Sequence, residues 1–264
     1  MALGEEFRQF FEYFRAAISR LEAMPDSLVS SLGPDKGIYA ALDAIILACA
    51  YIDTLSLFRY GEGKWSYIGF LETYPSDACR SYFRKMSCLY LDQPPLTREG
   101  KPIFSRAGEI RNKLYGTASP DVQTDLDFAH AWRIVKRAIP EVKPRELKEF
   151  SYAAYFYEYY RCYGVHSVQI PTGFGGTPPG RPYYEVRAGQ RAKLVFPPGF
   201  ILETLKTALE RLEKQVLAAV KAGEHATSAN KYEWVKAKYG VQSRFIETRL
   251  KYGWSLGVGD EANG

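Results

Sequence analysis

A nearly unbroken apolar run from Ile38 to Phe58 is the feature that most constrains how this chain folds. The run approaches the length of a membrane span, but it contains Asp43 and Asp53, and carboxylates are costly in lipid. A helix buried in protein explains the run better, and we expect no membrane contact. Because apolar residues wrap most of its circumference, this helix, over residues 39–59, is expected to lie centrally or to face a second subunit.

Other segments repeat apolar residues every three or four positions and are separated by prolines and glycines. Pro25 is expected to end the first of them. Prolines and glycines make the stretch of residues 92–120 irregular, and a helical turn or two is expected only over residues 105–114. Two strands, over 183–187 and 191–196, should form a hairpin around Ala188-Gly189-Gln190. The remaining predicted helices cover residues 5–24, 65–74, 77–90, 120–139, 147–161 and 200–222.

These elements predict an all-α fold, a helical bundle with a small β-hairpin between its last two core helices. The 264 residues are enough to bury about three quarters of the surface of the unfolded chain. We expect one helical domain over residues 1–223, with its core at 36–222 and the helix of 5–24 packed on it. Residues 224–264 form a basic, aromatic C-terminal extension.

Composition narrows the classes of function. The four cysteines lie far apart without the spacing of a zinc site, which favours a reducing cytosol. The amino terminus mixes charges with aromatics and lacks the apolar core of a secretory signal. We therefore expect a cytoplasmic protein with neither a metal nor a cofactor. The net charge of +5 permits a polyanionic partner without requiring one, and the aromatic fraction of 15% suits a core, an interface or base stacking.

The candidate catalytic residues are Arg161 and His166, at the expected end of the helix over 147–161. Arginine is a permanent forked cation suited to phosphate oxygens, and histidine exchanges a proton near neutral pH. On a regular helix, residues five apart point about 140° away from each other. The side chains of Arg161 and His166 therefore meet only if Gly164 ends the helix, or if a second subunit brings two such pairs into one cleft. Ordinary surface charge is the alternative reading.

Two carboxylates are candidate supporting residues. Asp53 lies in an apolar helix and needs a partner, which Arg161 or His166 would provide. Equally, Asp53 would be satisfied by capping a backbone group or by emerging at the surface. Glu158, three residues before Arg161, lies on the same helical face and is placed either to orient the guanidinium or to form an ordinary surface pair.

The C-terminal extension interleaves cations with aromatic residues, a composition found in nucleic-acid-binding segments. Lys236, Lys238 and Arg244 are its candidate RNA-binding residues. The alternative is an appended helix that packs its aromatics on the body and leaves a solvated basic face.

The sequence Arg161-Cys162-Tyr163-Gly164-Val165-His166 resembles the motif of the HEPN (higher eukaryotes and prokaryotes nucleotide-binding) superfamily. Ribonucleases of that superfamily carry an arginine, four to six residues and a histidine at the end of a penultimate helix. The resemblance extends to the buried helix with Asp53, the hairpin and the closing helix, roughly residues 36–222. It departs at Cys162, a further candidate supporting residue, where family members often have asparagine or another polar residue.

The resemblance implies a metal-independent endoribonuclease that acts as a homodimer and leaves a 2′,3′-cyclic phosphate and a 5′-hydroxyl. It implies RNA as substrate, a role in a toxin–antitoxin or antiviral system, and a cognate antitoxin or a nucleotidyltransferase as a further partner. The alternatives are a non-catalytic HEPN-like module that binds RNA, a nucleotide or a partner protein, and a helical scaffold without either property.

Overall fold

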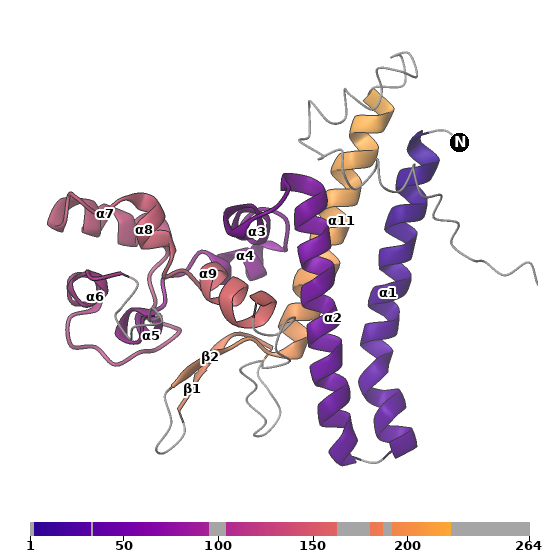
Figure 1. Ribbon diagram of the computed structural model, residues 1–264, viewed down its shortest axis with the longest axis horizontal. Helices are drawn as coiled ribbons and strands as arrows, with labels where there is room; N and C mark the ends of the chain where they lie inside the picture. The colour runs from indigo at the N-terminus through magenta and orange to yellow at the C-terminus, as the bar shows by residue number, and fades with distance from the viewer. Residues whose placement is uncertain (1–2, 33, 95–103, 163–179, 187–191, 223–264) are drawn as a thin grey trace, which may run out of the picture.

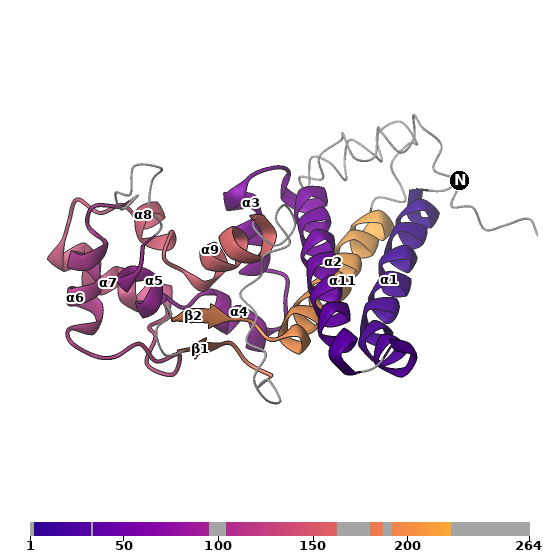
Figure 2. The same cartoon turned by 60° about the horizontal axis from the view of Figure 1, so that its bottom comes forward.

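The structure, a computed structural model, describes residues 3–32, 34–94, 104–162, 180–186 and 192–222. These residues are mostly helical, with one small antiparallel hairpin, so the predicted all-α class is confirmed. Three long helices lie side by side at one end of the molecule, and short helices and the hairpin occupy the other end (Figures 1 and 2).

The long helices α1 (Leu3–Leu32), α2 (Pro34–Tyr60) and α11 (Pro198–Ala222) pack against one another as a bundle. α1 and α2 run antiparallel (Figure 1). The start of α1 consequently meets the end of α2, where the rings of Phe10 and Phe58 stack with centroids 4.9 Å apart. Each such buried side chain stabilises the fold by roughly 1.5–3 kcal/mol.

Short helices make up the rest of the described chain before the hairpin. They are α3 (Lys64–Leu71), α4 (Asp77–Phe83), α5 (Cys88–Asp92), α6 (Ala107–Tyr115), α7 (Phe128–Ala138), α8 (Pro144–Lys148), α9 (Tyr152–Phe156) and the π-helical turn η1 (Tyr157–Cys162). α3 and η1 both contact α2, which places η1 where the short helices meet the bundle.

The hairpin consists of β1 (Tyr183–Glu185) and β2 (Lys193–Val195), with Tyr183 opposite Val195, and it leads into α11. The predicted hairpin and closing helix are therefore confirmed. Leu194, Val195 and Phe196 are buried, so the end of the second strand and the residue after it are enclosed in the protein.

Aromatic side chains fill the core beneath the hairpin. The ring of Phe196 lies 5.0 Å from that of Phe156, 5.3 Å from that of Tyr160 and 5.8 Å from that of Phe83. Edge-to-face and offset-stacked pairs of this kind contribute beyond their buried area. Much of the high aromatic content thus serves the core.

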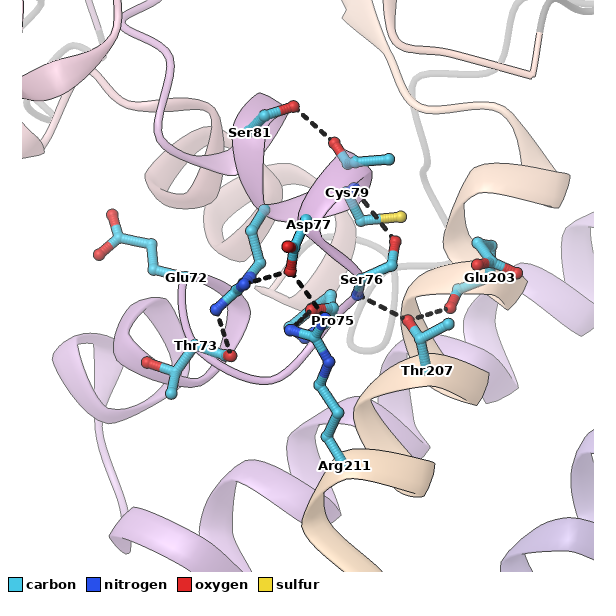
Figure 3. A network of polar contacts seen from close by, with 12 residues as sticks. Glu72, Thr73, Pro75, Ser76, Asp77, Cys79, Ser81, Glu203, Thr207 and Arg211 are labelled. Carbon is cyan, nitrogen blue, oxygen red and sulfur yellow. Dashed lines mark hydrogen bonds and ion pairs between the residues drawn. The ribbon is translucent and has the colours of Figure 1, made fainter. Parts of the chain in front are cut away.

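The turn before α4 is fastened to α11 by polar contacts (Figure 3). Arg211 donates to the carbonyl oxygen of Pro75 at 2.8 Å and to the carboxylate of Asp77 at 2.7 Å. The backbone N–H of Ser76 donates to the hydroxyl of Thr207 at 2.9 Å. These contacts fix the short helices on the bundle.

The prediction that Pro25 ends the first helix is wrong, because α1 continues to Leu32. A proline removes one backbone hydrogen bond, and packing can outweigh that loss. Since α1 and α2 form an antiparallel pair, α1 extends as far as its partner does.

Three further helix predictions miss breaks that have a common cause. Residues 84–87 run between two other segments and hydrogen-bond to both: Met86 N–H to Leu126 at 2.7 Å, and Ser87 N–H to Phe150 at 2.9 Å. These pairings draw three backbones out of helical geometry. As a result, the helix predicted over 77–90 is split into α4 and α5, that over 120–139 begins only at Phe128, and that over 147–161 is interrupted before Tyr152.

Among the helices that the structure describes, none is long and apolar enough to cross a membrane.

Candidate functional site

Arg161 lies in the π-helical turn η1, next to α2. A π-helix closes hydrogen bonds over five residues and appears mostly as a single turn, often at a functional site. Here the turn follows α9 directly. Two aromatic pairs run along α9 and η1: the rings of Phe156 and Tyr160 stack with centroids 4.9 Å apart, and those of Tyr155 and Tyr159 are tilted with centroids 4.3 Å apart. These rings anchor the segment that carries Arg161.

Asp53 of α2 is an ion-pair partner of Arg161. Nη2 of the guanidinium lies 3.0 Å from a carboxylate oxygen of Asp53, and the two side chains are 27% and 36% exposed. Of the partners expected for Asp53, the structure thus shows Arg161. The hydrogen bond that Arg161 donates to Asp53 raises the pKa of Arg161 above its already high value, so the cation is permanent.

Cys162 and Tyr157 complete the immediate surroundings of Arg161. The thiol of Cys162 is 3.9 Å from Nη1, and the guanidinium carbon lies 5.5 Å from the centre of the Tyr157 ring. Burial, followed by the neighbouring Cys162, raises the pKa of Tyr157. A cation over an aromatic face is stabilised, so Tyr157 provides one wall of the site.

Two buried residues that the sequence analysis did not single out lie beneath this group. Tyr67 of α3 contacts Tyr157 edge to face at 5.4 Å, and its hydroxyl has no hydrogen-bond partner among the described residues. Burial, and to a lesser extent the charge of Asp53, raises the pKa of Cys49. Neither residue stands in a motif, and only the packing of α3 against α2 and η1 brings Tyr67 here.

Glu158 is half-buried in η1. The pKa of Tyr90 is raised by burial first, then by Tyr159, and then by the charge of Glu158, which places that carboxylate near α5. The carboxylate that the structure shows on Arg161 is that of Asp53. The orienting role of Glu158 stays a prediction beside the observed contact of Asp53.

The other candidate residues of the sequence analysis, His166, Lys236, Lys238 and Arg244, lie outside the described residues. In the described ranges, no group of three or more histidine, cysteine, aspartate or glutamate side chains is arranged to hold a metal ion.

The arrangement provides a fixed, permanently charged guanidinium that remains partly open to solvent. An arginine carries five N–H donors in a planar fork that matches phosphate oxygens. Anchoring by Asp53 and Tyr157 restricts its orientation, and less entropy is then lost when an anion binds. Chemically, the group is suited to bind or stabilise a phosphate.

Comparisons with protein-family models, with curated proteins and with solved structures gave no match to this chain.

Proposed function

We propose that the protein is a metal-independent endoribonuclease in which Arg161 and His166 form the catalytic pair in a homodimeric cleft, as the resemblance to HEPN ribonucleases implies. The observation that supports the proposal is the anchoring of Arg161 by Asp53 at a partly exposed position. His166 follows five residues later, so an extended chain would keep their Cα atoms within about 18 Å.

In the proposed reaction the ribose 2′-hydroxyl attacks the adjacent phosphorus, and the bond from phosphorus to the 5′ oxygen breaks. The 2′-hydroxyl loses its proton to a base and the departing 5′ oxygen gains one, giving a 2′,3′-cyclic phosphate and a 5′-hydroxyl. His166 carries one of these proton transfers. Arg161 stabilises the charge that develops on the phosphoryl oxygens. DNA lacks the attacking hydroxyl and is excluded as a substrate.

The test is cleavage of a fluorescently labelled single-stranded RNA by the full chain in the presence of EDTA. His166→Ala and Arg161→Ala should each lower the cleavage rate by roughly 100-fold or more. Arg15→Ala is the matched control, because Arg15 also joins two helices through a carboxylate, that of Glu213 at 2.5 Å. His225→Ala is the control for loss of a histidine. Mass spectrometry of the products should find the cyclic phosphate.

Unchanged cleavage in both variants, or activity that disappears in EDTA, would contradict the assignment. RNA binding without turnover would instead support the non-catalytic HEPN-like module.

The dimer is tested by mixing the two inactive variants. If two subunits share one cleft, a mixed dimer of Arg161→Ala and His166→Ala retains one arginine and one histidine in it, and partial activity should return. Light scattering of the wild-type protein should report twice the chain mass. A monomer that cleaves RNA would contradict the shared cleft.

A further inference from the structure

Helix α7 presents one strongly cationic face to solvent. Ala131 and Val135 are buried, whereas Arg133, Lys136 and Arg137 are exposed. At about 100° per residue, these three side chains fall within an arc of roughly 100° on the helix. We call Arg133, Lys136 and Arg137 the α7 cationic face.

The cations of this face differ from several other cations of the protein that are paired across elements. Those pairs are Arg15 with Glu213, Lys206 with Glu22, Arg111 with Asp92 and Arg106 with Glu141. Over the part of the chain that the structure describes, none of Arg133, Lys136 and Arg137 forms an ion pair; only Nε of Arg133 makes a long contact, 3.4 Å, with the carbonyl oxygen of Ala129.

Interactions within the helix favour this arrangement only in part. Like charges three and four residues apart, such as Arg133 with Lys136 and Arg133 with Arg137, destabilise a helix by a few tenths of a kcal/mol per pair. The helix dipole favours cations in the last turn, where Lys136 and Arg137 stand, but not at Arg133 in the middle. A surface that keeps mutually repelling cations together is suited to a polyanion.

The neighbouring helix is mixed in charge, because the exposed Glu141 and Glu146 lie beside its cations. α8 packs against α7, and the exposed Lys143 and Arg145 lie at its start. The guanidinium of Arg145 stacks over the ring of Trp65 at 4.5 Å, which fixes its position. In both views α7 lies at the end of the molecule opposite α1 and away from α2, which carries Asp53 (Figures 1 and 2). The surface is therefore separate from the candidate site at Arg161.

We propose that the α7 cationic face binds the phosphate backbone of single-stranded RNA. The choice of RNA among polyanions rests on the proposed function, whereas the phosphate contact rests on the charges themselves. Contacts to phosphate position a strand without reading its sequence. The face therefore holds a substrate strand on the protein and contributes to affinity, not to the chemical step.

The test measures binding of a 2′-O-methyl oligouridine, which has no attacking hydroxyl and stays intact, by fluorescence anisotropy over a range of salt concentrations. The double variant Arg133→Gln/Arg137→Gln removes two cations and keeps residues that favour a helix. Binding should weaken, and the slope of log K against log salt should become shallower by about 1.4, since each phosphate contact with a single strand contributes about 0.7. Lys136→Gln should make the slope shallower by about half as much.

Arg15→Gln/Lys206→Gln is the matched control. It removes the same number of charges from exposed side chains of the bundle, which are 48% and 51% exposed, and should leave affinity and slope unchanged. The proposal is overturned if the α7 double variant binds like the wild type. It is also overturned if the control loses affinity equally, because the net charge of the protein would then explain the binding.

The two proposals fail separately. If the wild type does not cleave RNA but the α7 double variant loses affinity, the nuclease function is wrong and the binding surface stands. If the wild type cleaves RNA and the α7 double variant binds normally, only the surface is wrong.

Discussion

The guanidinium of Arg161 donates to the carboxylate of Asp53 at 3.0 Å, although 108 residues separate them in the sequence. The contact links η1 to α2, a largely apolar helix. Both side chains are partly exposed, so solvent screens their attraction, and an ion pair of this kind typically stabilises a protein by about 0–1 kcal/mol. Its larger effect is to set the direction of the guanidinium.

Replacement of Asp53 by asparagine should therefore affect RNA cleavage more than stability. The neutral amide holds Arg161 less firmly, and we expect a fall in kcat of about tenfold or more while the free energy of unfolding changes by no more than about 1 kcal/mol. Urea denaturation and single-turnover cleavage would measure the two effects. A coupling energy between Asp53→Asn and Arg161→Gln well above about 1 kcal/mol would argue instead for a buried structural pair.

Removal of the hydroxyl from Tyr67 and from Tyr160 should have different effects on stability. Both side chains are buried, and both rings stack on Phe156. The hydroxyl of Tyr160 accepts the backbone N–H of Phe196 at 2.8 Å, whereas that of Tyr67 has no partner among the described residues. Tyr160→Phe should cost roughly 1–3 kcal/mol, because a buried N–H loses its acceptor.

Tyr67→Phe should leave stability unchanged or raise it by about 1 kcal/mol, since an unpaired buried hydroxyl costs free energy in the folded protein. Denaturant unfolding of the two variants under the same conditions gives the comparison. A loss of stability in Tyr67→Phe would mean that the hydroxyl has a partner, such as an enclosed water molecule.

The elements that the sequence predicts well are those whose apolar pattern is long and continuous. α2, α11 and the hairpin appear close to their expected bounds, because each is specified by its own residues. The three missed helix breaks all arise where residues 84–87 pair with segments far along the chain. A local pattern does not contain such a pairing, and tertiary hydrogen bonds override helix propensity there.

In the candidate site, too, some features are specified by local sequence and others by tertiary packing. Asp53 was predictable as a residue in need of a partner because a carboxylate in an apolar helix is unusual. The π-helical turn and the position of Tyr67 were not, since both depend on how α2, α3 and α9 pack together. Packing of distant elements, more than any motif, decides the surroundings of Arg161.

The four cysteines predict a selective chemical modification. Cys49, Cys79 and Cys88 are buried, and burial raises the pKa of each thiol, that of Cys88 to about 11. Cys162 is half-buried. Because the thiolate is the nucleophile, iodoacetamide should alkylate Cys162 first in the native protein. Peptide mass spectrometry would identify the modified residue.

An adduct on Cys162 would stand within 3.9 Å of the guanidinium of Arg161 and should block RNA cleavage. The variant Cys162→Ser should then be active and insensitive to the reagent. Alkylation of the three buried cysteines as fast as Cys162 would contradict the burial that the structure assigns to them.

Asp125 predicts a dependence of stability on pH. Its carboxylate is buried and accepts hydrogen bonds from the hydroxyl of Tyr152 at 2.7 Å, from the hydroxyl of Tyr184 and from the backbone N–H of Cys88 at 3.2 Å. Burial outweighs these bonds and raises the pKa of Asp125 to about 6. The unfolded chain has a value near 3.9. Between about pH 4 and pH 6 the folded protein therefore holds a proton that the unfolded chain has released.

Stability from this group is fully present below about pH 4 and is lost as the pH rises through about 6. Asp125→Asn does not titrate, so the wild type should lose stability relative to this variant across that window, by on the order of 2–3 kcal/mol, with no further change above about pH 7. Urea denaturation of both proteins at a series of pH values gives the difference. Burial also raises the pKa of Glu72, but Glu72 titrates in both proteins and its contribution cancels in the difference. A difference that stays constant from pH 4 to pH 7 would show that Asp125 ionises as freely in the folded protein as in the unfolded chain.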